Sequence, residues 1–274
     1  MAARTTTMDS LSFMDRLILR IKRADTPFTR FARNALRKVL NPKAPPIPRF
    51  LKPVLRAAYE GRILAIVFGR ALITIFYRHP LFQARCASIG RGVIIEGLPF
   101  VSGHVQLHIG NGVWIGGGVA ILSGRIFDEP KLIMKDRSGV GWNTIITVNR
   151  EVVLEEDVIV SYDCRITDTD GHSREADLRA AGVPPDPRDI RPVRICRNAW
   201  IGNGAHIMKG VTIGEGAIIG ANSVVITNIP PYALAMGNPA EVLIRNYGMP
   251  AEMKRKLREA RAAARQAQSA EKPQ

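Results

Sequence analysis

The chain has 274 residues, with 39 Lys and Arg against 24 Asp and Glu, which gives a formal net charge of +15 and an isoelectric point near 10.4. Hydrophobic residues make up 46% of the sequence, so a disordered or fibrous chain is excluded. Residues 1–85 carry 17 basic and 4 acidic side chains, residues 86–249 carry 15 and 17, and residues 250–274 carry 7 and 3. The positive charge therefore belongs to the two ends, which argues against a nucleic-acid-binding body.

The N-terminal residues 1–85 predict a basic helical extension. Apolar residues between positions 9 and 40 recur with helical spacing, and Asp9 or Ser10 is placed to cap the first turn. A second helix is expected from Pro53 to about Tyr77, after the breaker sequence APPIPR. Basic amphipathic helices of this kind bind an anionic membrane surface, where each basic residue contributes about 1 kcal/mol. The alternative is that they pack on an open end of the following domain and shield its strand edges.

Two features bear on the cellular compartment. Charged residues interrupt the only candidate for a secretory signal, and the longest apolar run, residues 63–77, contains Arg70 and is shorter than the roughly 20 residues that cross a bilayer. The cysteines Cys86, Cys164 and Cys196 are widely spaced, which fits reduced thiols and no zinc knuckle. We therefore expect a cytoplasmic protein, which the N-terminal helices would attach to the membrane face if they bind lipid.

From residue 89 onward an aliphatic residue recurs every six positions. Eighteen such hexads can be counted, and the phase changes only at segments that have the composition of loops. Their first residues are Ile89, Ile95, Val101, Ile109, Ile115, Ile121, Met134, Val140, Ile146, Leu154, Val160, Ile166, Ile195, Ile201, Ile207, Ile213, Ile219 and Val225.

A period of six fits neither an α-helix nor an ordinary half-buried strand, and it predicts a parallel β-helix. In that fold three hexads close one triangular coil, and the aliphatic first positions stack in the interior. Eighteen hexads give about six coils and, at strand spacings of about 4.8 Å, a prism about 29 Å tall.

The repeat resembles that of the hexapeptide-repeat acyltransferases over about residues 89–245. Residues 198–225 and 229–245 are similar to the closing coils and exit strand of galactoside, maltose and xenobiotic O-acetyltransferases. The resemblance implies a mainly β protein, with a left-handed parallel β-helix over residues 86–245 that departs from the usual right-handed crossover. A basic helical extension (1–85) and a charged C-terminal helix or tail (246–274) would flank it. It also implies a homotrimer and acetyl-CoA as the acyl donor.

His172 is the expected general base of acetyl transfer. An imidazole is mostly neutral yet basic at pH 7, and His172 stands where the repeat gives way to a loop of about twenty residues that leaves the rigid coils. In the related enzymes a catalytic histidine occurs at this point. Asp170 or Asp168 is expected to orient its ring. Taken alone, however, a histidine after Asp-Gly is also an ordinary exposed loop residue.

Other site residues follow from the resemblance only. It implies that Asn143 contacts the acceptor, although asparagine is also common in such turns. The positions implied to hold coenzyme A are Trp200, Gly202, Asn203, Ala221 and Thr227.

The related enzymes often carry a lysine near the nucleotide phosphate, in the sequence Thr-Lys-Asp before Ile-Pro-Pro. This chain has Ile226, Thr227 and Asn228 there, so the phosphate contact would have to come from Arg245 or from basic residues 254–256. The fold also hosts zinc-dependent carbonic anhydrases, which need three convergent histidines. The sequence offers no such set, so no metal is expected.

Together these observations predict an O-acetyltransferase that acetylates a sugar hydroxyl, in surface or lipid-linked polysaccharide biosynthesis. Two alternatives remain open. One is an acetyltransferase for a small molecule such as serine or a xenobiotic, which would not need the basic ends. The other is a non-catalytic β-helix scaffold, which would not bind coenzyme A.

Overall fold

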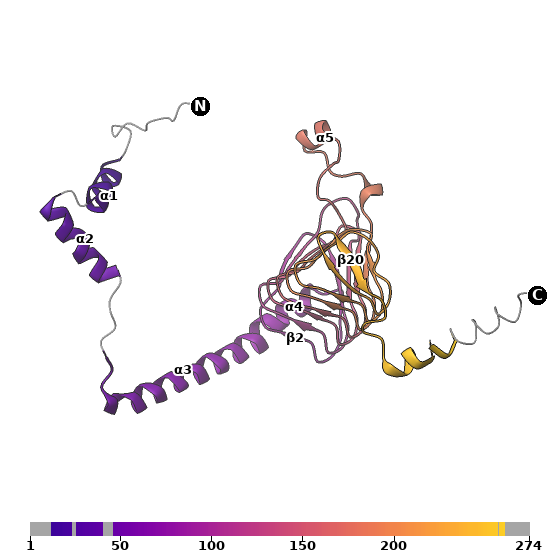
Figure 1. Ribbon diagram of the computed structural model, residues 1–274, viewed down its shortest axis with the longest axis horizontal. Coiled ribbons are helices and arrows are strands. Elements are labelled where there is room, and N and C mark those ends of the chain that lie inside the picture. The colour runs from indigo at the N-terminus through magenta and orange to yellow at the C-terminus, as the bar shows by residue number, and fades with distance from the viewer. Residues whose placement is uncertain (1–11, 24–25, 41–45, 257, 261–274) are drawn as a thin grey trace, which may run out of the picture. The chain divides into compact units, whose positions relative to one another are not determined.

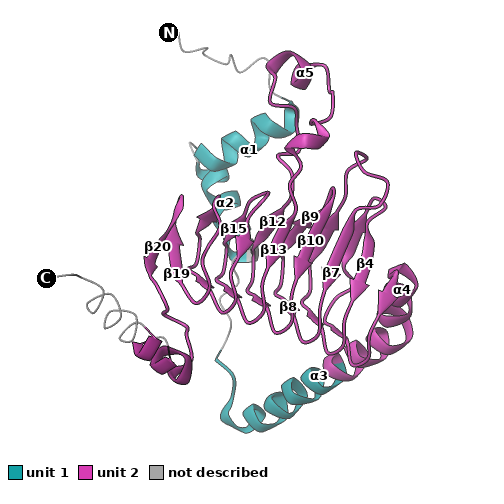
Figure 2. Ribbon diagram, turned by 90° about the vertical axis from the view of Figure 1, so that its right-hand side faces the viewer, with its two compact units in different colours: residues 1–65 teal, residues 66–274 magenta. Residues whose placement is uncertain are grey.

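The computed structural model describes residues 12–23, 26–40, 46–256 and 258–260. It divides into two compact units, residues 1–65 and residues 66–274, coloured separately in Figure 2. The boundary lies inside a helix, so the end of that helix and the next one belong with the β-rich unit rather than with the N-terminal helices. The candidate site lies entirely in the second unit.

The first unit is helical, as the sequence predicts. Helices α1 (Phe13–Arg23) and α2 (Pro27–Leu40) contact each other, and Ser12 caps α1 by accepting a 3.1 Å hydrogen bond from the Asp15 amide. The predicted caps Asp9 and Ser10 lie outside the described residues. After a short turn, η2 (Arg49–Leu51), helix α3 (Lys52–Ile73) continues into the second unit, and it has no buried residue. None of the helices in the described ranges combines the length and apolar character needed to cross a membrane.

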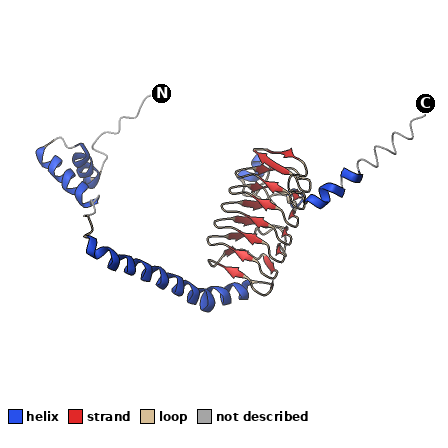
Figure 3. Cartoon of the chain, turned by 60° about the horizontal axis from the view of Figure 1, so that its bottom comes forward, coloured by secondary structure: helices blue, strands red, loops and turns tan. Residues whose placement is uncertain are grey.

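The second unit is a stack of six coils, each made of three short strands (Figure 3). The strands are β1 (Ser88–Ile89), β2 (Ile94–Ile95), β3 (Phe100–Ser102), β4 (Gln106–Ile109), β5 (Trp114–Ile115), β6 (Ala120–Leu122), β7 (Lys131–Met134), β8 (Gly139–Val140), β9 (Ile145–Thr147), β10 (Glu151–Leu154), β11 (Ile159–Val160), β12 (Arg165–Thr167), β13 (Val193–Ile195), β14 (Trp200–Ile201), β15 (His206–Ile207), β16 (Thr212–Ile213), β17 (Ile218–Ile219) and β18 (Val224–Val225).

Parallel pairing of every third strand builds three faces. The first face has the order β1-β4-β7-β10-β13-β16, the second begins β2-β5-β8-β11-β14-β17, and the third is β3-β6-β9-β12-β15-β18. We call the turns from first to second face the first corner, from second to third the second corner, and from third back to first the third corner. Each coil therefore contributes one turn to each corner.

The predicted hexads match the strands one for one. Every first position lies in one of β1 to β18, and all are buried except Ile89 and Val101, which are half-buried. Equivalent residues such as Ile166 and Ile207 face each other in register on successive coils. Burying each such side chain contributes about 1.5–3 kcal/mol, so the aliphatic column is the main source of stability.

A short helix closes the first coil. After a π-helical turn, η3 (Thr74–Arg78), helix α4 (His79–Arg85) inserts Phe82, which is 1% exposed, into the core. Three polar side chains from this segment donate to backbone carbonyl oxygens of the coil at 2.9–3.0 Å: Arg78 to Glu96, His79 to Val93, and Arg85 to Val105 and Gly103. This part of the extension therefore caps the β-helix, which was one of the two predicted roles.

The opposite end carries a hairpin, β19 (Leu234–Gly237) and β20 (Ala240–Ile244). Strand β19 pairs in parallel with β17 and antiparallel with β20, which extends the second face to eight strands. Figure 2 shows α4 and this hairpin at opposite ends of the stack. Residues 251–256 and 258–260 are helical, in agreement with the expected C-terminal helix.

Candidate active site

Two long loops leave the β-helix at its third corner. Residues 123–130 follow β6, and residues 168–192 follow β12 and carry the short helices α5 (Ala176–Ala180) and η4 (Pro187–Asp189). Figure 2 shows α5 raised above the edge of the coils. A cavity of about 620 Å³ lies between the bases of the two loops, with Asn149 from the intervening turn on its wall. We call it the His172 cavity, because His172 also lines it.

His172 is exposed, and no hydrogen bond to its ring is present in the described part of the chain. It follows Gly171, whose φ of 81° lies in the left-handed region that favours glycine. The backbone before it is fixed: Thr167 donates through Oγ1 to the Thr169 carbonyl at 2.8 Å, and Thr169 accepts from the Gly171 amide at 3.0 Å. The predicted base is thus an available imidazole on a rigid support.

Asp168 is fully buried and binds backbone rather than the histidine. Its carboxylate accepts from the amides of Asn149 at 2.8 Å, Arg150 at 2.6 Å and Glu151 at 3.0 Å. Burial raises the pKa of Asp168, and these amides oppose the rise because they favour the carboxylate. Asp168 therefore joins the start of the long loop to the turn that carries Asn149, and it shapes two walls of the His172 cavity.

Asp170 forms an ion pair with Lys209, which follows β15 on the next coil. The Lys209 side chain is 6% exposed, whereas that of Asp170 is 35% exposed and also lies 3.8 Å from the Arg174 guanidinium. Neither Asp168 nor Asp170 hydrogen-bonds to His172 among the described residues. The role of either aspartate in orienting the ring stays a prediction.

Asn143 lies at the second corner, whereas His172 lies at the third. It occupies a turn with a φ of 57°, and its side-chain amide donates to Asp163 in the equivalent turn of the next coil at 3.2 Å. These are the features of a turn asparagine, which tolerates the left-handed region. Among the residues that the structure describes, Asn143 is not part of the lining of the His172 cavity.

The residues predicted to hold coenzyme A cluster at the second corner of the last two coils, apart from Thr227. Trp200 is 50% exposed on β14, and Asn203 and Ala221 are exposed in successive turns. Gly202 must be glycine, because a Cβ there would lie 2.7 Å from the Ile219 carbonyl oxygen. Thr227 is exposed at the third corner, after β18.

This edge combines backbone hydrogen-bond donors with an apolar surface. The backbone amides of Asn203 and Ala221 donate to no other group in the described part of the chain, so both are available to a ligand carbonyl. Trp200 supplies an apolar surface beside them and holds its indole N–H 3.2 Å from Ser161. The arrangement offers hydrogen-bond donors and a flat hydrophobic contact along a single edge.

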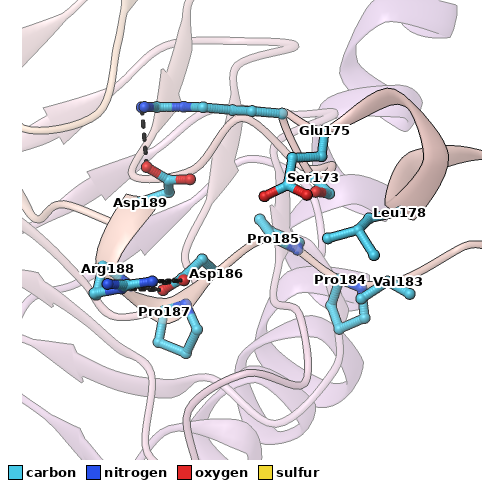
Figure 4. Close-up of a pocket in the computed structure, with 11 residues that line it drawn as sticks. Ser173, Glu175, Leu178, Val183, Pro184, Pro185, Asp186, Pro187, Arg188 and Asp189 are labelled. Atoms are coloured by element: carbon cyan, nitrogen blue, oxygen red, sulfur yellow. Dashed lines mark hydrogen bonds and ion pairs between the residues drawn. The ribbon is translucent and has the colours of Figure 1, made fainter.

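Other hollows lie nearby. A groove of about 680 Å³ on the third face is lined by Arg165, His206 and Asp170, and a hollow of about 660 Å³ lies within the long loop itself (Figure 4). Across the described ranges, no three His, Cys, Asp or Glu side chains are grouped to hold a metal ion.

Sequence reasoning missed four residues around the His172 cavity: Asn149, Arg125, Arg179 and Lys209. Arg179 lies in the loop that the sequence singled out, so its presence near the site was foreseeable. The others come from different coils and are brought together only by the fold.

Comparison with known proteins identifies the repeat. Residues 192–227 match the family model described as bacterial transferase hexapeptide (six repeats). The chain carries the bacterial transferase hexapeptide repeat. This match covers the coils from β13 to β18.

Two curated relatives agree with it. A probable acetyltransferase of Mycobacterium tuberculosis is 31% identical over 157 residues, which are 57% of this chain and 48% of the relative. A candidate acetyltransferase of Staphylococcus aureus is 52% identical over 52 residues, 19% of this chain and 26% of the relative. The chain thus spans less than half the length of these curated relatives.

Among solved structures, AntD, an N-acyltransferase from Bacillus cereus in complex with dTDP and 3-hydroxybutyryl-CoA, has a similar fold. The TM-score is 0.51 at 16% sequence identity, and the match covers 68% of this chain and 97% of AntD. These findings confirm the predicted resemblance to hexapeptide-repeat acetyltransferases and the predicted left-handed parallel β-helix.

Proposed function

We propose that this protein is a coenzyme A-dependent O-acetyltransferase that moves an acetyl group from acetyl-CoA to a sugar hydroxyl. The observation that carries the proposal is His172, an imidazole without a hydrogen-bond partner in the described chain, on the wall of a cavity of about 620 Å³ at the edge of a hexapeptide-repeat scaffold. The relatives named as acetyltransferases support the reaction class.

In the proposed mechanism His172 removes the proton of the acceptor hydroxyl as the oxygen attacks the acetyl carbonyl carbon. The tetrahedral intermediate then collapses, the carbon–sulfur bond breaks, and the leaving thiolate takes the proton back from the imidazolium. A positioned general base typically contributes about 10²–10⁴-fold to such a reaction. Asp168 and the Asp170–Lys209 pair hold the segment that carries the base, and either aspartate is proposed to orient the ring when substrate is bound.

The donor is proposed to lie in a groove between neighbouring copies, along the second-corner edge formed by Trp200, Gly202, Asn203 and Ala221, with Thr227 nearer the nucleotide, so that its thioester reaches His172 of the adjacent copy. The exposed indole and the two available amides support this placement. The ligand in the AntD structure, 3-hydroxybutyryl-CoA, is a donor of the same chemical class. No metal takes part in the proposal.

We propose a homotrimer as the active form. Asn143 and His172 lie at different corners of the same prism, so both can face one acceptor only if a neighbouring copy supplies the asparagine. A closed cyclic assembly provides such a contact three times. Light scattering tests this: a mass of three times 30.1 kDa is expected, and a monomer would contradict it.

The acceptor is proposed to be a sugar of a surface or lipid-linked polysaccharide, and the enzyme to act in the cytoplasm at the membrane face. Helices α1 and α2 support the attachment: Phe13, Phe28 and Phe31 are each at least 71% exposed, alongside basic residues of the same helices. Aromatic and basic side chains together favour binding to anionic lipid.

Thiol release from acetyl-CoA with free and lipid-linked sugar acceptors tests the reaction. We expect His172→Ala to lower kcat by about 10²–10⁴-fold. His108→Ala is the matched control, because His108 lies on the first face and its ring bonds to Ser88 and to no other side chain in the described ranges. A folded His172→Ala protein with full activity would disprove the mechanism. Failure to bind acetyl-CoA would favour the scaffold, and turnover restricted to serine or a drug would favour the small-molecule alternative.

Co-sedimentation of the full chain with anionic vesicles tests the attachment. Changing Arg30, Arg37 and Lys38 in α2 to Gln is expected to reduce binding strongly, because each basic residue contributes about 1 kcal/mol. Changing Lys254, Arg255 and Lys256 to Gln removes the same charge from the C-terminal helix and serves as the control. Equal losses from both variants would remove α2 as the attachment site.

A further inference from the structure

The His172 cavity is positively charged. Two of its lining residues are arginines, Arg125 from the first loop and Arg179 from α5, and no aspartate or glutamate lines it. Neither arginine forms an ion pair with a carboxylate in the described part of the chain. The cavity therefore concentrates positive charge beside the proposed catalytic base.

The neighbouring hollow within the long loop shows the opposite arrangement. There Arg188 pairs with Asp186 at 2.6 Å, and Arg174 pairs with Asp189 at 3.1 Å, so each lining arginine already has its carboxylate (Figure 4). Arg174 and Arg188 are thus neutralised within the loop, whereas Arg179 of the same loop faces the His172 cavity without a carboxylate partner among the described residues.

Both arginines are carried by ordered structure. Arg179 donates through Nη1 to the carbonyls of Ser173 and Arg174 at 3.1 Å, which leaves its Nε and Nη2 groups for another partner. The loop that carries Arg125 is fixed by a 2.8 Å hydrogen bond between the His104 ring and the Phe127 carbonyl. A guanidinium held in this way is well suited to bind a phosphate or carboxylate through two parallel hydrogen bonds.

We propose that Arg125 and Arg179 form the binding site for a negatively charged group of the acceptor, a phosphate or a carboxylate, whose sugar ring presents a hydroxyl to His172. This inference rests on the proposed function, and it names the acceptor class: an acidic or phosphorylated sugar rather than a neutral one. Residues 86–249 as a whole carry slightly more acidic than basic side chains, so the positive charge of the His172 cavity is a local feature and not part of a generally basic surface.

The phosphates of coenzyme A are the other possible source of negative charge. The nucleotide end of the donor is proposed to lie near Thr227, at the third corner after the sixth coil, whereas the loops that carry Arg125 and Arg179 leave the second and fourth coils. The arginines also line the same cavity as His172, where the attacking hydroxyl must lie. These positions favour the acceptor, rather than coenzyme A, as the source of the negative charge that binds the two arginines.

Calorimetric titration of the full-length protein measures the site without requiring catalysis. The probes are two pairs that share a sugar ring: glucose 1-phosphate with glucose, and galacturonate with galactose. Because hydrogen bonds between charged groups are the strong ones, we expect the charged member of a pair to bind about 10- to 100-fold more tightly. Equal affinities within both pairs, or no binding of either charged sugar at millimolar concentration, would overturn the inference.

Three variants test whether Arg125 and Arg179 bind the charged group of the sugar. Arg125→Gln and Arg179→Gln are each expected to weaken binding of the charged sugar by about 10-fold or more and to leave the neutral sugar unchanged. Arg125 makes no hydrogen bond in the described chain, so its substitution does not disturb the loop. Arg188→Gln removes an arginine of the same long loop that is already paired with Asp186, and it is expected to change nothing.

Acetyl-CoA titrations with the same variants separate the two sources of phosphate. Unchanged affinity for acetyl-CoA supports the acceptor site, whereas a loss confined to acetyl-CoA would overturn it. The result is distinguishable from failure of the proposed function. Charged sugars that bind through Arg125 without any acetyl transfer would contradict the enzyme, and efficient transfer to neutral sugars alone would contradict only the anion site.

Discussion

The ion pair between Asp170 and Lys209 connects the segment before His172 to the next coil, and its two members are buried to different extents. Lys209 is 6% exposed and Asp170 is 35% exposed. Removing Asp170 therefore leaves a buried ammonium without its partner, whereas removing Lys209 leaves a carboxylate that reaches water and lies 3.8 Å from Arg174. The two substitutions should not be equivalent.

Breaking a buried pair by removing one partner costs about 3–5 kcal/mol. Solvent around Asp170 weakens this pair, so we expect Asp170→Ala to lower the free energy of unfolding by about 2–3 kcal/mol. Lys209→Met keeps the aliphatic length of the side chain and should cost about 1 kcal/mol or less. The double variant should recover most of the loss caused by Asp170→Ala, because it no longer contains an unpaired ammonium.

Urea denaturation of the four proteins at one fixed concentration measures these differences, since oligomerisation would otherwise change the apparent stability. The activity assay supplies a second measurement, because a loosened support for His172 should lower kcat in the Asp170→Ala protein. A Lys209→Met variant that is less stable than Asp170→Ala would refute the reasoning. The larger cost would then not come from leaving the more deeply buried member of the pair without its partner.

Two further predictions concern the capped end of the coils. Phe82→Ala removes the aromatic plug, which is 1% exposed, and should lower the free energy of unfolding by about 3–5 kcal/mol, as measured by urea denaturation; an effect below 1 kcal/mol would show that α4 does not close the core. Burial raises the pKa of Cys86 to about 11, against the opposing effect of Arg85, so at pH 8 the reactive thiolate is only about one part in a thousand. Iodoacetamide should therefore label Cys86 about 100-fold more slowly in the folded protein than in urea, with the rate rising toward pH 11, and equal rates in the two states would contradict it.

The repeat was readable from the sequence because its physical requirement is local and periodic. Each coil needs one aliphatic residue per strand, and a change of phase is tolerated only where a loop leaves the stack. For this reason even the hexads at Ile146 and Leu154, which lie on either side of the short turn between β9 and β10, fall in their expected strands. The long loop after β12 was visible as the place where the period stops.

The side-chain contacts of the candidate site were harder to predict from the sequence. Asp168 and Asp170 are close to His172 in sequence, which suggested that one of them orients the ring, yet their side chains bind backbone amides and Lys209. The direction of a side chain in a loop depends on partners from other coils, and a sequence without a fold does not supply them. The two roles predicted for the basic extension had the same limit: α4 caps the coils, whereas α1 and α2 belong to the other unit and contact each other.

The coils also have a modular consequence for the length of the molecule. Each coil pairs only with the one before and the one after it, and the His172 cavity is built entirely from residues that precede β13. One more coil of three hexads placed directly after β18 would offer its strands the same partners and would move the terminal hairpin outward by about 4.8 Å. Proteins of this architecture can therefore lengthen at that end by whole coils while the His172 cavity keeps its geometry.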